Sequence, residues 1–220
     1  MSNRQPPRVG ILQHSFRKNN ISLFFVSTRP EVAPKDLIRS VKGRLPHRIR
    51  HEVPKAFQRN YWLRSVGTCT RSVIEEYVES QVERYPQVDP RLEERLDDYS
   101  RSYPEVDLGQ VRSTAHGRFW YNVHLVLAND GRMMEVRDQT LRRLLGMAEG
   151  VARKHEYLMS RLSVLPDHVH LTLGLPIDES PQGGACRFMN NLAYVHGMDR
   201  IFPFSYYVGT FGEYDRGACR

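Results

Sequence analysis

Two histidines spaced two positions apart, His168 and His170, are the residues of this sequence best suited to hold a metal ion together. They lie in a run, residues 165–174, in which polar and apolar residues alternate. Side chains of a β-strand point to opposite faces in turn, so both imidazoles leave the same face and could share one ion. Buried histidines with a purely structural role are the alternative that this short motif leaves open.

A tyrosine and a glutamine one helical turn apart, Tyr77 and Gln81, form a second pair of interest. The apolar spacing predicts a helix over residues 71–82, with Thr70 as its cap and a stripe at positions 74, 77, 78 and 81. A tyrosine hydroxyl, with a pKa of about 10, attacks only when its proton is removed or its anion is stabilised. A core tyrosine would occupy the same kind of position, so the pattern alone allows either role.

The charge of the chain is unevenly distributed. The formal net charge is +7, and residues 1–81 hold 15 Lys or Arg against 6 Asp or Glu, whereas residues 82–110 are acidic. A basic N-terminal third is what binding to a phosphate backbone requires, although a solvated face would look the same. The predicted contacts with a nucleic-acid backbone are Lys35, Arg39, Lys42, Arg44, Arg48, Arg50 and Lys55.

The composition is that of a globular protein that can bury a core, with 220 residues, 40% of them hydrophobic and 26% charged. No apolar run approaches the roughly 20 residues needed to cross a bilayer, and the polar N-terminus does not resemble a secretory signal. The three cysteines are scattered, which favours a reducing compartment and argues against a structural zinc site. We therefore expect a cytoplasmic protein.

Strands and helices alternate along the chain, which predicts an α+β fold with one main sheet. We expect strands at 9–12, 21–26, 61–67, 119–128, 157–165, 168–174 and 204–212, and helices at 33–43, 71–82, 139–155 and 181–194. The strand at 21–26 is apolar on both faces and is predicted to be central in a sheet. Prolines and charge runs predict a first unit over 1–82, an acidic linker over 83–110 with a short helix near 90–99, and a second unit over 111–220.

The two units repeat one another. Residues 20–25 lie 147 positions before residues 167–172, and residues 60–67 lie 145 positions before residues 205–212. In both copies the pattern predicts a strand, a helix and a second strand in the same order. Ile21 and Leu23 occupy the places of His168 and His170, while the position matching Tyr77 would be 222. One copy keeps the histidines and the other keeps the tyrosine helix, unless short β-segments resemble each other here by chance.

With these features the sequence resembles the HUH-type single-tyrosine transposases of small bacterial insertion sequences and their repetitive-palindrome-associated relatives. The resemblance rests on the stretch 166–171 with its histidine pair, on 41–44 and 61–67, and on the helix 74–81. The order differs, because in the family the histidine pair precedes the tyrosine. The chain is thus similar to two incomplete copies fused, with a pseudo-duplicated fold of a mostly antiparallel sheet flanked by helices (ferredoxin-like or RRM-like).

The resemblance implies a metal-dependent enzyme that cleaves and rejoins single-stranded DNA through a 5′-phosphotyrosine. It makes Tyr77 the nucleophile, His168 and His170 metal ligands and Gln81 the third protein ligand, with Mg²⁺ or Mn²⁺ as the ion. Single-stranded or hairpin DNA is the implied partner, in the cytoplasm at the bacterial nucleoid. Family members work as dimers, so the fused halves could form a homodimer or a pseudo-dimer with one composite site.

Two other classes stay open. A domesticated, catalytically inactive DNA-binding protein would keep the fold and the basic face. A two-histidine phosphoesterase would need a second His-x-Thr or His-x-Ser strand besides His170-Leu171-Thr172, and His124 is instead followed by Leu125 and Val126.

Overall fold

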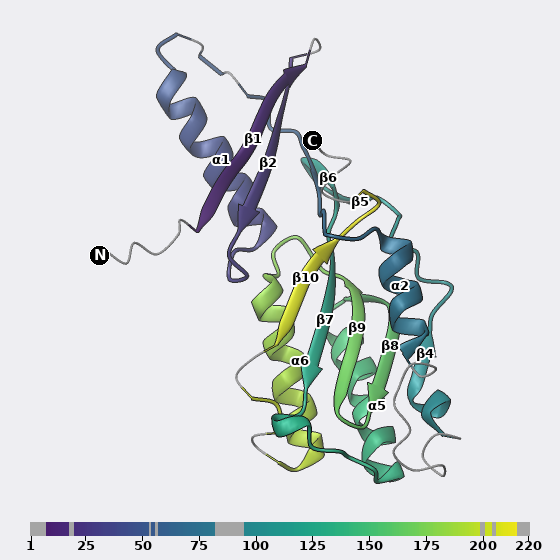
Figure 1. Ribbon diagram of the computed structural model, residues 1–220. Coiled ribbons are helices and arrows are strands. Elements are labelled where there is room, and N and C mark those ends of the chain that lie inside the picture. The colour runs from purple at the N-terminus through teal and green to yellow at the C-terminus, as the bar shows by residue number, and fades with distance from the viewer. Residues whose placement is uncertain are drawn as a thin grey trace.

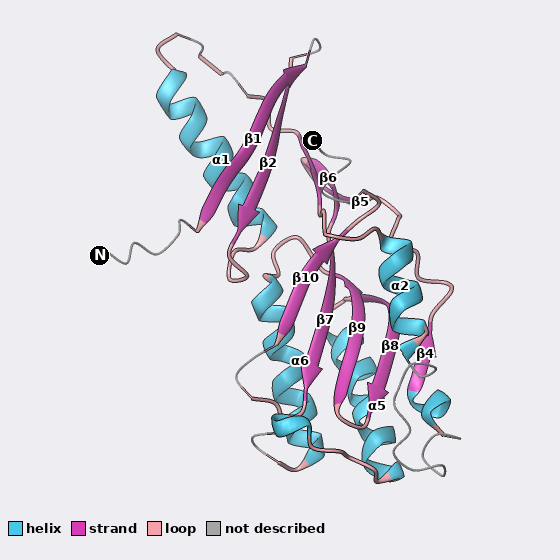
Figure 2. Ribbon diagram, in the orientation of Figure 1, coloured by secondary structure: helices cyan, strands magenta, loops and turns pink. Residues whose placement is uncertain are grey.

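The computed structural model describes residues 8–17, 20–52, 54–55, 57–81, 95–198, 201–203 and 206–214. These residues form a small N-terminal unit and a larger second unit (Figures 1 and 2), which meet just after the strands β3 (Tyr61–Arg64) and β10 (Tyr207–Phe211). Among the described helices, none is long and apolar enough to span a membrane. The fold is α+β, with mostly antiparallel sheets flanked by helices, which confirms the predicted class.

The second unit is built on a five-stranded antiparallel sheet with the strand order β10-β7-β9-β8-β4. Two helices, α5 (Asp138–Lys154) and α6 (Pro181–His196), cover one face, and α2 (Arg71–Glu79) contacts β8 and β9 on the other (Figure 1). Every residue of β9 is buried, because this strand lies between two strands and under helices on both faces. The strands are β4 (Ser100–Ser102), β7 (Asn122–Ala128), β8 (Leu158–Leu165), β9 (His168–Gly174) and β10 (Tyr207–Phe211).

Apolar side chains of β9 and of the two helices form the core on the α5–α6 side. Val169, Leu171 and Leu173 alternate with the histidines along β9 and belong to this core, together with Leu144 of α5 and Phe188 of α6. The period of two along the strand therefore separates an apolar face from the face that carries the imidazoles. The opposite face is the one that receives α2.

The N-terminal unit is a hairpin with one helix beside it. Strands β1 (Val9–Arg17) and β2 (Ile21–Thr28) pair antiparallel, and α1 (Pro34–Ile49) runs along the hairpin (Figure 2). The chain continues into β3 (Tyr61–Arg64), which joins a three-stranded sheet of order β3-β6-β5. The other elements of the described residues are β5 (Arg112–Thr114), β6 (Gly117–Trp120), and the 3₁₀ helices η1 (Leu96–Tyr99) and η2 (Asp130–Arg132).

The hairpin β1–β2 repeats the hairpin β8–β9 in detail. Each has one register shift near its open end, between Ile11 and Gln13 in the first and between Met159 and Arg161 in the second. A helix of 16 residues follows each hairpin and begins with a proline, either Pro34 or Pro181. A short strand, β3 or β10, comes next. These shared features are what a duplication of one β–β–α–β unit produces.

The two copies touch through reciprocal contacts. Ser65 Oγ donates a hydrogen bond to the carbonyl oxygen of Phe211 at 2.5 Å, and Thr210 Oγ1 donates one to the carbonyl oxygen of Val66 at 2.6 Å. At a spacing of 145 residues, Ser65 corresponds to Thr210 and Val66 to Phe211. In each copy a hydroxyl thus donates to a carbonyl oxygen at the equivalent position of the other copy, which is the pattern of an interface with two-fold symmetry.

Glycine at two positions allows the strand ends to approach this closely. A Cβ atom on Gly67 would lie 2.2 Å from the carbonyl oxygen of Thr210, and one on Gly212 would lie 2.2 Å from that of Ser65. Thr70 then forms a parallel β-bridge with Gly212, and α2 begins at Arg71, directly after Thr70. The meeting of the two strand ends therefore directs the helix of the first copy onto the sheet of the second.

Two predictions about the first unit were wrong. The strand at 21–26 is not central, because in the described part of the chain β2 pairs with β1 alone and leaves Ile21 50% and Leu23 44% exposed. The helix does not end at Gly43 but continues to Ile49, with Pro46 inside it. Leu45 and Ile49 are partly buried and extend the apolar side of the helix by one turn each, which favours its continuation past Gly43.

Other boundaries shifted as well. The predicted strand at 119–128 is divided between two sheets, since β6 ends at Trp120 and β7 starts at Asn122. The stretch after residue 95 belongs to the second unit, where Leu96, Tyr99 and Leu108 are buried and β4 pairs with β8. Residues 82–94 of the acidic run lie outside the described residues, and so does the start of the helix expected near 90–99. The same holds for residues 204–205 of the last predicted strand.

Candidate active site

Helix α2 is fixed on the histidine face of the second sheet by three kinds of contact. The side chain of Val78 is fully buried. The hydroxyl of Ser160 donates a hydrogen bond to Glu75 Oε1 at 2.7 Å, and that of Ser163 donates one to the carbonyl oxygen of Val78 at 3.3 Å. Because these contacts lie on either side of position 77, they set where the tyrosine can lie.

Tyr77 lies against the histidines. Its ring centroid is 5.7 Å from that of His170 and 6.2 Å from that of His124, the latter in an edge-to-face arrangement. Tyr77 is still 39% exposed, so a large substrate can reach it. The residues predicted as nucleophile and metal ligand come from different copies and are 93 positions apart in sequence, yet the fold brings them into contact.

The two histidines of β9 are buried and close together. Their ring centroids are 4.6 Å apart, with His168 8% and His170 4% exposed. His168 Nδ1 lies 2.5 Å from Asp167 Oδ1, and Asp167 is also paired with Arg132 at 2.8 Å. A neutral His168 that donates its Nδ1 proton to this carboxylate keeps its Nε2 lone pair for a cation.

Burial keeps these imidazoles neutral. It lowers the pKa of His168 in spite of the opposing hydrogen bond and charge of Asp167. It lowers the pKa of His170 to about 2, with a smaller contribution from the neighbouring His168. Neutral imidazoles are the form that coordinates a metal ion, so the environment suits the predicted role of both residues.

A third histidine, His124 of β7, belongs to the same cluster, and sequence reasoning missed it. Its Nε2 atom is 3.3 Å from His170 Nδ1, and burial lowers its pKa to about 4. The antiparallel register places His124 opposite Thr172 and therefore on the histidine face. Period-two alternation could have placed His124 on one face of its strand. The sequence does not show, however, which strand β7 pairs with, because that depends on the tertiary structure.

Gln81 lies one turn beyond Tyr77, and its amide nitrogen donates a hydrogen bond to the carbonyl oxygen of Tyr77 at 3.1 Å. The side-chain carbonyl Oε1 is therefore the atom left for a cation. In the described part of the chain, no group of three or more His, Cys, Asp or Glu side chains is placed to hold a metal ion. Among the described residues, the histidine pair thus offers two nitrogen ligands, and the amide oxygen of Gln81 is a candidate ligand of another type.

Six of the seven predicted DNA contacts are exposed, on α1 or in the turn after it. The exception is Lys42, whose Nζ donates hydrogen bonds to the carbonyl oxygens of Gln58 and Asn60 at 2.6 and 3.0 Å. Lys42 therefore holds the segment after α1 in place. Two of the exposed residues have weak ion pairs, Arg39 with Asp36 at 3.6 Å and Lys35 with Asp178 at 4.0 Å, and exposed pairs of this kind contribute little.

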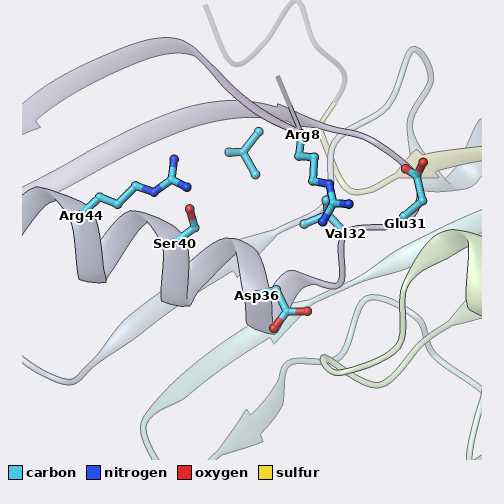
Figure 3. A pocket seen from close by; sticks show the side chains of 7 residues that line it. Arg8, Glu31, Val32, Asp36, Ser40 and Arg44 are labelled. Atoms are coloured by element: carbon cyan, nitrogen blue, oxygen red, sulfur yellow. The ribbon is translucent and has the colours of Figure 1, made fainter. Parts of the chain in front are cut away.

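A pocket of about 460 Å³ lies beside α1 in the first unit (Figure 3). Ser40 and Arg44 project into it from α1, and Arg8 reaches it from the strand side. Glu31 and Asp36 share its lining, so its charge is mixed. This pocket contains none of the predicted catalytic residues, and we assign the chemistry to the cluster on the second sheet.

The fold therefore brings a tyrosine on a helix next to paired histidines on an antiparallel sheet. A comparison with protein families gives one match for the part of the chain that carries this helix. Residues 8–81 match the model of the family described as transposase IS200 like. The match includes Tyr77 and ends at Gln81, and it confirms the resemblance to tyrosine transposases that the sequence motifs indicate.

The solved structures that are similar to parts of the chain include the following two. One is a REP-associated tyrosine transposase bound to a REP hairpin, with 14% identity, 41% of this chain and 56% of that chain covered, and a TM-score of 0.37. The other is a candidate transposase from Deinococcus radiodurans R1, with 21% identity, 49% and 92% covered, and a TM-score of 0.41. The chain thus spans little more than half of the first structure's length. The comparison with curated proteins gave no match.

Proposed function

We propose that this protein cleaves and rejoins single-stranded DNA, with Tyr77 as the nucleophile. The Tyr77 oxygen bonds to the scissile phosphorus while the bond from phosphorus to the 3′ oxygen breaks. The tyrosine proton is lost, and the departing 3′ oxygen takes up a proton to become a free hydroxyl. The 5′-phosphotyrosine that results retains the energy of a phosphodiester, so a later 3′-hydroxyl can reverse the step and join a new strand.

The observation that carries this proposal is the contact between Tyr77 and His170. A core tyrosine needs no imidazole neighbours, whereas Tyr77 lies over two and stays 39% exposed. His168 and His170 would hold Mg²⁺ or Mn²⁺ through Nε2, with Gln81 as a further ligand. When bound, such an ion polarises the scissile phosphate and offsets the charge that develops on it.

The proposed substrate is single-stranded DNA with a nearby hairpin. The exposed basic side chains of α1, among them Arg44 and Arg48, would contact its phosphate backbone. With such a substrate, the proposed location of the protein is the cytoplasm, at the nucleoid. The reciprocal contacts between the copies support a pseudo-dimer within one chain, and a homodimer of such chains is the form that could act on two DNA ends.

The test is a covalent trapping experiment. The purified protein is incubated with labelled hairpin-bearing single-stranded DNA and Mn²⁺ and is run on a denaturing gel, beside Tyr77→Phe and the double variant His168→Ala/His170→Ala. We expect a covalent protein–DNA band that both variants lose. A band that persists in Tyr77→Phe would refute the assignment and move the nucleophile elsewhere. Tyr207→Phe is then the next variant, because the Tyr207 ring is 5.8 Å from His124.

One observation favours a second candidate, an inactive DNA-binding protein of the same fold. His168 and His170 are less than 10% exposed, and the described residues contain no three-ligand group of the usual types. Tight hairpin binding with no covalent band from any related DNA end would support that reading. The phosphoesterase alternative still lacks its second motif, since Val126 stands where that motif needs a hydroxyl side chain.

A further inference from the structure

His124 is a buried polar residue that the proposed reaction does not yet use. It is 6% exposed, and its ring contacts three others: Tyr77 at 6.2 Å, His170 at 5.3 Å and Tyr207 at 5.8 Å between centroids. A buried imidazole without a function is costly, because its polar nitrogens need partners that an aliphatic side chain would not. The partner that the structure gives it is His170, through Nε2 and Nδ1 at 3.3 Å.

The hydrogen bond between these two histidines can exist in two forms. If His124 Nε2 carries the proton, it donates to His170 Nδ1, and a neutral His170 then has its own proton on Nε2. If instead His170 Nδ1 donates to His124 Nε2, the Nε2 atom of His170 keeps its lone pair. Only the second form leaves His170 able to bind a cation through Nε2.

We infer that His124 is a positioning residue, which accepts the Nδ1 proton of His170 and so turns the His170 Nε2 lone pair toward the metal ion. This inference rests on the proposed metal site. His124 does for His170 what Asp167 does for His168, so each ligand has its own partner on the Nδ1 side. A role as third ligand does not fit, since the three imidazoles are not placed to hold one ion.

The position of His124 has a second consequence. Its edge-to-face contact with Tyr77 links the ring that orients the ligand to the ring that carries the nucleophile. Because β7 and β9 are paired through His124 and Thr172, His124 is fixed by the sheet and not by the substrate. The site is therefore organised by a residue on a third element, besides the tyrosine helix and the histidine strand.

Two substitutions separate this role from simple packing. His124→Phe keeps a flat ring beside Tyr77 but removes the acceptor, whereas His124→Gln offers an amide oxygen that can accept from His170. Mn²⁺ binding is measured on the full chain without DNA, from the loss of the electron paramagnetic resonance signal of free Mn²⁺. We expect His124→Phe to weaken binding by about 10- to 100-fold, the usual effect of losing such a partner, and His124→Gln to restore most of it.

The control is His116→Phe, the same substitution at an exposed position of the turn between β5 and β6, which should bind Mn²⁺ like the natural sequence. Melting curves establish that each variant is folded. Equal Mn²⁺ affinity in His124→Phe and the natural sequence would overturn the inference, as would the absence of Mn²⁺ binding by the natural sequence. Weakened Mn²⁺ binding in His124→Phe and its recovery in His124→Gln, with no covalent band from the natural sequence, would instead refute the proposed function and leave the role of His124 standing.

Discussion

The substitution Val78→Ala tests whether the docking of α2 holds Tyr77 at the histidines. Val78 is 0% exposed and is the residue by which this helix is buried against the sheet. The change removes the volume of about two methylene groups at ~0.8 kcal/mol each and leaves a small cavity, so we expect a loss of about 2 kcal/mol. That corresponds to a factor of about 30 in the docking equilibrium of α2.

Hydrogen exchange measures this effect directly. The amides of α2 should exchange about 30-fold faster in Val78→Ala, while those of β9 should change little, because the α5–α6 side of the sheet is untouched. The rate of covalent adduct formation should fall as well. The matched control is Val73→Ala in the same helix, where the side chain is 51% exposed and the expected change is below about 0.5 kcal/mol. Equal effects of the two substitutions would refute the reasoning.

Three further predictions concern the joint, the core and the DNA-binding face. Gly67→Ala should lower the melting temperature and the adduct yield together, since its Cβ would meet the carbonyl oxygen of Thr210 at 2.2 Å. Burial and the hydrogen bond to Asp138 raise the pKa of Tyr99 to about 12. The stability that the protonated Tyr99 hydroxyl contributes is therefore complete below about pH 10 and is lost as the pH rises through 12. Denaturant midpoints of the natural sequence and of Tyr99→Phe, measured between pH 9 and 12, check this. Arg48→Ala should weaken hairpin binding and reduce the slope of log K against log salt by about 1, and an unchanged slope would remove this residue from the DNA contacts.

Much of the fold could be predicted because its strongest signals are local. The apolar stripe of Leu141, Leu144, Ala148 and Val151 identified α5, and all four side chains are buried as the spacing requires. The failures lie where tertiary pairing decides. The strand at 21–26 has the composition of a central strand, but composition cannot show that it lacks a second neighbour, as β2 does in the described residues.

In the candidate site, too, the sequence could identify single residues but not the tertiary contacts between them. The histidine pair and the tyrosine helix each have a period that places their side chains on one face, so their residues could be named from the sequence. Their contact could not, because it depends on the joint between Ser65 and Phe211 that carries α2 across to the second sheet. His124 was missed for the same reason, since it joins the cluster only through the register of β7 on β9.

The two copies share an interface, but only the sheet of the second copy carries the histidine pair, while Tyr77 comes from the first copy. Ile21 begins β2 as His168 begins β9, and Leu23 follows where His170 stands, so the sheet of the first copy presents aliphatic side chains at the places of the imidazoles. A helix carried back across the joint to that sheet would therefore meet no metal ligand. It follows from the proposed function that each chain forms a single phosphotyrosine. Joining two cut strands then requires either two chains or two successive reactions at the same Tyr77.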